Sequence, residues 1–171
     1  MMSENARVLT DLVRLQAVAS YDLFHPVLAA ELRGVCLRTA ERLGMPLAAV
    51  QAVLNTSTTA LATNGGEGDF LSPLGGTPNE ISMCPAVVVT GRPLIAGDLR
   101  RSDDFAGTPG VLTGLVLAYA GVPLTSESGE LIGTHCVMSP EAREFSAADI
   151  DNLHIGAAEV MDILARYRIT E

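Results

Sequence analysis

Two neighbouring apolar segments constrain the fold of this chain more than any other feature. Leu115–Leu124 and Leu131–Met138 are long enough for strands, and a polar loop over residues 125–130 joins them as a hairpin. Neither segment alternates between apolar and polar residues. Strands that are apolar on both sides occur in sheets with both faces covered. The sequence therefore predicts a central sheet with further structure packed on each face.

Helical patterns near both ends predict the helices of this fold. Apolar residues recur at helical spacing over residues 8–19, with Ser3 as a candidate N-cap. A second helix is expected to begin with Pro26 in its first turn and to end at Gly44. The last helix should begin at residues 146–149, where Ser-Ala-Ala-Asp matches a capping box.

The middle of the chain predicts a second hairpin followed by a long loop. Residues 48–54 and 58–63 are expected to form paired strands. Asn64–Asn79 is rich in glycine and proline, and a connection of this length is usually functional, so we expect a lid. The segments that follow predict a short helix over 80–90, a strand over 93–96 and a polar loop over 98–110.

The charged residues exclude several classes of function. The chain has 20 acidic and 11 basic residues, and all of the basic residues are arginines. Without a lysine there is no Schiff-base chemistry and no phosphate-loop lysine. A net charge of −9 disfavours nucleic-acid binding. The apolar runs are too short for a membrane span and no signal peptide is evident, so we expect a cytoplasmic protein without a membrane partner.

An ordered series of short motifs runs from Ile81 to Leu153. It consists of Ser82-x-Cys84, Val88-x-Thr90-Gly91-Arg92-Pro93-Leu94, Asp98, Phe105, Tyr119-Ala120-Gly121-Val122-Pro123-Leu124, Gly129, Ile132-Gly133-Thr134 and Phe145-Ser146. In order and spacing this series resembles the GAF domains of sensor kinases. The resemblance implies an α+β, PAS-like fold with a central antiparallel sheet of about five or six strands. Helices from both ends would cover one face, and a pocket beneath the short helix and loops would lie on the other.

The resemblance also implies an organisation and a site. Residues 1–45 would be N-terminal helices belonging to the domain and mediating dimerisation, and residues 46–171 the GAF domain proper. The pocket would lie beside the loop Asn64–Asn79 and among Ile81, Cys84, Asp98, Arg100, Phe105 and Tyr119. The ligand is unknown. Bilin-carrying GAF domains commonly pair their cysteine with a following histidine, and Pro85 stands there instead. Asp98 fits a ligand contact and a cap of the local backbone equally well.

The three cysteines are expected to differ in reactivity. Cys84 lies near the start of the short helix, which favours a reactive thiolate, although a small buried side chain is the alternative. Cys84 and Cys136 are the candidate redox residues, with Cys84 reacting first, and Cys36 matches no functional position. His135 and Cys136 should point to opposite faces of their strand and so cannot share a metal. No metal site is predicted.

The function implied by the resemblance is non-catalytic sensing of a small molecule. No output domain fits beside the sheet, so the signal would pass to a separate protein. Surplus apolar helix surface over residues 3–43 and 146–167 predicts a homodimer, with Leu12 and Leu153 in its seam. One alternative is a free methionine-(R)-sulfoxide reductase, disfavoured because residues 105–119 hold neither Cys nor Glu. Another is a ligand-free dimeric scaffold. The lysine-containing cyclic-nucleotide signature cannot occur here.

Overall fold

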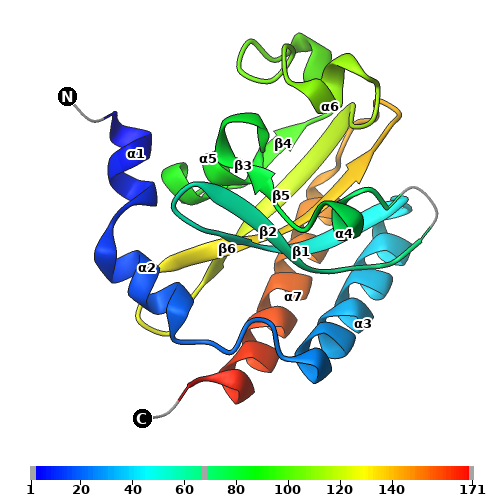
Figure 1. Ribbon diagram of the computed structural model, residues 1–171. Coiled ribbons are helices and arrows are strands. Elements are labelled where there is room, and N and C mark those ends of the chain that lie inside the picture. The colour runs from blue at the N-terminus through cyan, green and yellow to red at the C-terminus, as the bar shows by residue number, and fades with distance from the viewer. Residues whose placement is uncertain (1–2, 67–68, 170–171) are drawn as a thin grey trace.

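A computed structural model describes residues 3–66 and 69–169 (Figure 1). Its centre is a six-stranded sheet in the order β3-β2-β1-β6-β5-β4, with every neighbouring pair antiparallel. The strands are β1 Leu47–Val53, β2 Ser57–Thr63, β3 Thr77–Pro78, β4 Leu94–Ala96, β5 Ala118–Thr125 and β6 Leu131–Ser139. The helices are α1 Glu4–Leu9, α2 Leu12–Ala19, α3 Pro26–Leu43, α4 Leu71–Leu74, α5 Cys84–Thr90, α6 Pro109–Leu112 and α7 Ala147–Leu164. The predicted α+β fold with an antiparallel sheet is confirmed.

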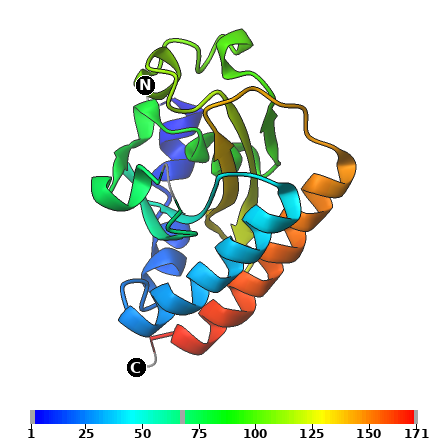
Figure 2. The same cartoon turned by 90° about the vertical axis from the view of Figure 1, so that its right-hand side faces the viewer.

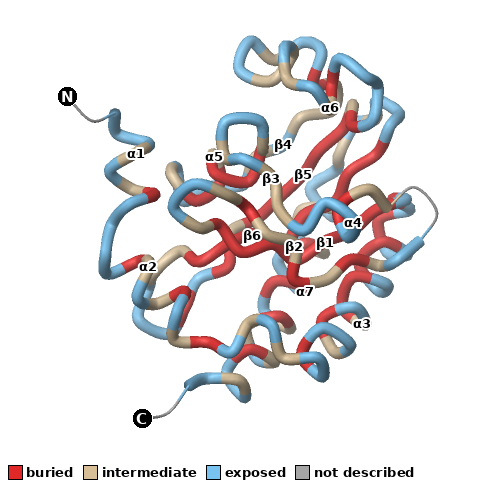
Figure 3. The backbone as a smooth tube through the Cα atoms, viewed as in Figure 1, coloured by how far each residue is buried: buried red, intermediate tan, exposed pale blue. Residues whose placement is uncertain are grey.

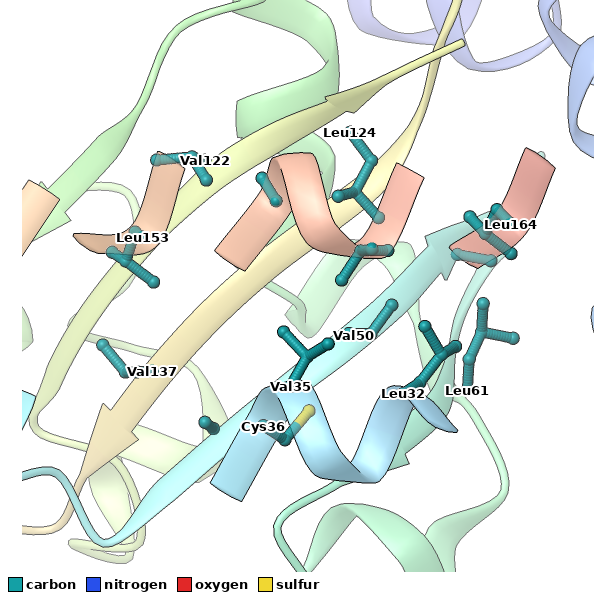
Figure 4. Close-up of a cluster of buried hydrophobic side chains, with 14 of the residues drawn as sticks. Leu32, Val35, Cys36, Val50, Leu61, Val122, Leu124, Val137, Leu153 and Leu164 are labelled. Carbon is teal, nitrogen blue, oxygen red and sulfur yellow. The ribbon is translucent and has the colours of Figure 1, made fainter. Parts of the chain in front are cut away.

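The helices α3 and α7 lie side by side across one face of the sheet, as Figure 2 shows. We call this the helix face. An ion pair of 2.7 Å between Arg38 and Glu159 joins the two helices, and Arg166, in the 3-10 turn after α7, lies 2.6 Å from Glu31 of α3. The apolar stripes of both helices pack onto the sheet in a continuous core (Figure 4), whose labelled members are Leu32, Val35, Cys36, Val50, Leu61, Val122, Leu124, Val137, Leu153 and Leu164.

Local signals set the helix ends as expected. Ser3 caps α1, accepting a hydrogen bond from the amide of Ala6. Gly44 ends α3 in the left-handed conformation, at φ 66°. The capping box of α7 is present in both directions, because the Ser146 and Asp149 side chains each accept a bond from the other's backbone amide. These three boundaries are confirmed.

The first predicted helix is wrong as a single element. It is divided into α1 and α2 by a new N-cap, Asp11, which accepts a bond from the amide of Arg14. The helix α1 contacts α5 on the opposite side of the sheet from α3 and α7, and Leu9 is buried there. Apolar periodicity continues across the break, so the pattern alone gave no sign of it.

Arg14 fixes this arrangement from inside the protein. Its side chain is 2% exposed, and within the described parts of the chain none of its hydrogen bonds goes to a carboxylate. The guanidinium instead donates to backbone carbonyls, at 2.8 Å to Val53 and 3.2 Å to Leu131, near ends of the central strands β1 and β6. It also donates to Val8, Leu9 and Leu54. Donation to carbonyls satisfies a buried cation that has lost its water.

The second face, which we call the cavity face, is built from short elements. The predicted helix over 80–90 divides into a 3-10 turn at Asn79–Ile81 and α5. The loop Asn64–Asn79 contains α4 and β3 rather than irregular chain alone. The strand β5 begins at Ala118, not at Leu115, because the chain turns after α6 with Gly114 at φ 73°.

Both faces of the central strands are covered, as the sequence predicts. Every residue of β1 is buried, as are all residues of β6 except Leu131, and Figure 3 shows this buried centre. In the described parts of the chain no helix combines the length and apolar character needed to cross a bilayer.

Candidate functional site

A cavity of about 290 Å³ lies between the sheet and the short elements of the cavity face. Its walls are mainly apolar side chains from the loop around α4, the chain before α5, the region around α6, and β6, namely Phe70, Leu71, Leu74, Ile81, Met83, Val111, Leu115, Val116 and Met138. Among the described residues that line it, none has a charged side chain. Such a cavity favours an uncharged molecule of small size.

Three polar side chains form the floor of the cavity. They are Gln51 of β1, Cys84 of α5 and Tyr119 of β5, and their exposed fractions are 3%, 1% and 0%. The Cys84 sulfur is their meeting point. Gln51 Nε2 donates to it at 3.2 Å, and the Tyr119 hydroxyl lies 3.3 Å away in a hydrogen bond that either atom can donate. Behind the floor, Thr134 Oγ1 donates to the same sulfur at 3.1 Å.

Strand register brings these residues together. Gln51 pairs directly with Thr134 across β1 and β6, so both side chains lie on the same face of the sheet. Tyr119 lies two residues before Gly121 on β5, and residues two apart share a face. A Cβ atom at position 121 would collide with the Tyr119 hydroxyl. The missing side chain of Gly121 therefore gives the tyrosine ring room to lie along the strand.

The hydrogen bonds around Cys84 favour its ionised form. The bond from the Cys136 thiol lowers the pKa of Cys84 most, and bonds from Thr134 and Tyr119 act with it against burial, so that the pKa falls to about 7. The pKa of Cys136 rises because its thiol proton is held by Cys84. Burial raises the pKa of Tyr119, and the Cys84 charge adds to this effect. Ionisation at the floor is therefore concentrated on one sulfur.

The structure brings together only part of the predicted pocket. Ile81, Cys84 and Tyr119 line the cavity. Asp98, Arg100 and Phe105 do not.

Asp98 and Arg100 bind each other away from the cavity. The Asp98 carboxylate accepts two bonds from the Arg100 guanidinium at 2.8 Å and one from the Arg100 amide at 3.1 Å. The guanidinium lowers the pKa of Asp98 to about 2. Phe105 is half-buried and packs against the cavity-face core. These three residues therefore lie outside this cavity, with the two charges paired to each other and the ring packed on the core. Their contact with a ligand stays a prediction.

The sequence interpretation missed Gln51 and Thr134. A signal for Gln51 was present, because it is the single polar residue in the strand Leu47–Val53, and a buried amide requires partners. Thr134 is two residues from Cys136, a predicted redox residue. Its position next to the cavity floor follows from its pairing with Gln51 across β1 and β6, and no local sequence pattern reveals that pairing. The two candidate redox cysteines, Cys84 and Cys136, do lie together, since Gln51 Nε2 also donates to Cys136 Sγ at 3.6 Å.

His135 lies on the helix face, as expected for the neighbour of Cys136 in a strand. Its two ring nitrogens bond the Thr39 hydroxyl at 2.8 Å and the Ala49 carbonyl at 3.0 Å. Burial lowers the pKa of His135 to about 4, which keeps the ring neutral. Within residues 3–66 and 69–169, no three His, Cys, Asp or Glu side chains are grouped to hold a metal ion. His135 is therefore a satisfied structural residue.

The sequence model of the family described as GAF domain matches residues 30–165. The chain belongs to the GAF domain family. Among solved structures, the GAF domain of an Acinetobacter phosphoenolpyruvate-protein phosphotransferase is similar to this GAF domain with a TM-score of 0.66 and 14% identity, over 97% of this chain and 96% of that one. Among curated proteins, no sequence matches.

Two enzymes share the fold. A type II free methionine-R-sulfoxide reductase from Thermoplasma acidophilum has a TM-score of 0.66 and 16% identity, over 86% of this chain and 99% of its own. The free methionine-R-sulfoxide reductase from Neisseria meningitidis has a TM-score of 0.63 and 18% identity, over 96% and 93%. At these identities the likeness of the whole group shows the fold alone.

Proposed function

We propose that this GAF domain is a sensor that binds a small, uncharged and largely apolar molecule in the cavity above Gln51, Cys84 and Tyr119. The observation that carries the proposal is the uncharged lining of that cavity. Apolar walls provide affinity by removing ligand surface from water, and the few polar groups of the floor fix orientation. The domain then passes the signal to a separate protein.

Reduction of free methionine sulfoxide is the second candidate, suggested by the two reductases of the same fold. Free methionine sulfoxide carries an ammonium and a carboxylate at neutral pH. Among the described residues that line this cavity, none is cationic, so the carboxylate would meet no opposite charge, and a buried unpaired ion costs several kcal/mol. The uncharged lining therefore favours the sensor over the reductase.

Matched probes of equal size test the proposal. Benzyl alcohol is uncharged, whereas benzoate and benzylammonium are charged molecules of similar shape. We expect benzyl alcohol to raise the melting temperature and to bind saturably in calorimetry, and the charged probes to do neither. Tighter binding of the charged probes, or turnover of methionine sulfoxide with a thiol reductant, would contradict the sensor.

Two glycine variants show whether binding takes place in this cavity. Gly110 lines it, and a Cβ at that position would meet only Val116 Cγ2 at 3.9 Å. Gly107 is exposed, with nothing within 4 Å of its Cβ position. We expect Gly110→Leu to weaken benzyl alcohol binding at least tenfold, and Gly107→Leu to leave it unchanged.

We also propose that the sensor is a homodimer formed through its terminal helices. Val27 and Leu37 of α3 and Ile155 of α7 are about half exposed, which leaves apolar surface on the outer side of the helix face. Leu153 is fully buried within the protomer, so placing it in the seam was wrong, whereas Leu12 is 72% exposed. Light scattering at micromolar concentration should give a dimer that Leu37→Asp converts to a monomer. If light scattering shows that the unmodified protein is a monomer, the dimer proposal is wrong.

A further inference from the structure

We propose that the floor of the cavity is a covalent capture site, where Cys84, assisted by Tyr119 and Gln51, adds to an uncharged α,β-unsaturated carbonyl compound. This inference rests on the proposed binding of an uncharged molecule and adds a bond to it. It concerns the chemistry of a cluster, because Gln51, Cys84 and Tyr119 all line one cavity and their polar atoms meet at the Cys84 sulfur.

The first argument is the number of donors that converge on one sulfur. Gln51 and Thr134 donate to Cys84 Sγ at 3.2 and 3.1 Å, and the Tyr119 hydroxyl lies 3.3 Å from it. A neutral thiol is a weak acceptor, whereas a thiolate accepts several strong bonds. The floor is therefore arranged around a nucleophilic sulfur.

Cys36 provides a comparison within the same protein. It is buried like Cys84, but it lies in the apolar core of the helix face, and its thiol has one weak bond, to the Ala62 carbonyl at 3.8 Å. Burial raises the pKa of Cys36 to about 12. Ordinary packing of a cysteine in this fold thus suppresses ionisation. The opposite result at Cys84 comes from the surrounding donors.

The second argument is the match between the cavity and the reactant. An enone or enal is uncharged and so is its adduct with a thiol, so neither leaves an unpaired charge among the apolar walls. A cavity of about 150 Å³ accepts benzene. The cavity of about 290 Å³ is therefore large enough for a six-membered cyclic enone. Cys136 does not line the cavity, so among its described lining residues Cys84 presents the one thiol to the reactant.

The reaction balances without an oxidant or a leaving group. The Cys84 sulfur forms a bond to the β-carbon as the carbon–carbon π bond breaks, and the electron pair moves to the carbonyl oxygen as an enolate. Tyr119 and Gln51, whose donors no longer face a thiolate, can donate to that oxygen. The α-carbon then takes a proton equivalent to the one lost by the thiol. In sum, S–H adds across C=C.

The experiment compares 2-cyclohexen-1-one with its saturated analogue cyclohexanone at neutral pH. Intact-protein mass spectrometry and peptide mapping should find one adduct, on Cys84, in the folded protein. All three cysteines should react after denaturation. Cys84→Ser should abolish the adduct of the folded protein, and Cys36→Ser should not change it. Tyr119→Phe keeps the ring but loses the donor, and should slow the reaction roughly tenfold.

The saturated analogue separates this inference from the proposed function. If cyclohexanone binds saturably but the enone gives no adduct, covalent capture is overturned and non-covalent sensing stands. If neither compound binds or reacts, both proposals fail. An adduct that persists in Cys84→Ser, or equal labelling of Cys36 and Cys84 in the folded protein, also overturns capture.

Discussion

The two faces of the sheet surround their buried polar residues differently. On the helix face, the His135 ring bonds Thr39 and the Ala49 carbonyl, and the surrounding core belongs to two long helices. On the cavity face, the neighbouring residue Cys136 accepts a hydrogen bond from Gln51, which also donates to Cys84 at the cavity. Adjacent residues of β6 thus lie in two different environments, a packed core and the layer beneath the cavity floor. What distinguishes the two faces is that the polar partners of His135 lie within a packed core, whereas Gln51 and Cys84, the polar neighbours of Cys136, line a cavity.

The largest expected difference between the faces is the effect of removing a buried leucine. Leu153 is fully buried in the helix-face core, so Leu153→Ala should reduce the free energy of unfolding by about 3–5 kcal/mol, through lost transfer energy and a new void. Leu71 already borders the cavity, so Leu71→Ala enlarges an existing space and should cost about half as much. Denaturant titration measures both. Equal losses would mean that the cavity face is as tightly packed as the helix face.

Acid should destabilise the helix face through His135. The pKa of His135 is about 4 in the folded protein, below the ordinary value of 6.5, so the unfolded chain binds the proton more readily. The stabilisation is therefore complete above about pH 6.5 and is lost as the pH falls toward 4, by about 3 kcal/mol. His135→Gln, which cannot titrate, should flatten the dependence in this window. An unchanged slope in that variant would assign the acid sensitivity to other groups.

Replacing a glycine by alanine should also change the free energy of unfolding differently on the two faces, by less than the leucine substitutions do. A Cβ at Gly156 of α7 would lie 2.6 Å from His135 Nε2 and 2.8 Å from Thr39 Oγ1. Gly156→Ala should therefore cost about 1–3 kcal/mol, since the helix must move away from the sheet. Gly110→Ala on the cavity face is the matched control and should be nearly neutral. A stable Gly156→Ala protein would show that α7 can shift freely.

The smallest expected effect is a shift in the pH profile of Cys84. Alkylation of the folded protein by 2-cyclohexen-1-one should rise with pH around a midpoint near 7, where the thiol ionises. Cys136→Ala removes the hydrogen bond that lowers this pKa most, so the midpoint should move upward. Stopped-time labelling followed by mass spectrometry gives the profile. A midpoint that stays in place would assign the low pKa to Thr134 and Tyr119 instead.

The sequence predicts helix boundaries well where the signal is local. Gly44 and the Ser146–Asp149 box each define an end within one turn of chain, and both are confirmed. The division between α1 and α2 was missed because apolar spacing continues across Asp11, and Arg14 selects the bend through carbonyls far away in sequence. Hydrogen bonds between residues far apart in the sequence do not alter the periodicity of the apolar residues, so the sequence does not reveal them.

The residues of the candidate site also divide into those that the sequence indicates and those that depend on contacts between distant segments. Cys84 and Tyr119 follow from the resemblance to a family, and both lie at the cavity. Gln51 and Thr134 depend on strand register, which pairs residues that are 83 positions apart and cannot be read from either segment alone. Asp98 and Arg100 were expected at the pocket because charge and family position suggested a ligand, whereas their loop satisfies the two charges internally.

The buried guanidinium of Arg14 has a consequence for where this folding unit begins. The family match starts at residue 30, yet the carbonyls of Val53 and Leu131 in the sheet accept hydrogen bonds from the side chain of residue 14. A shorter protein starting at residue 30 would leave these acceptors with water or with nothing. We therefore expect a truncation that removes residue 14 to destabilise the fold, because the segment before residue 30 supplies internal hydrogen bonds to the sheet.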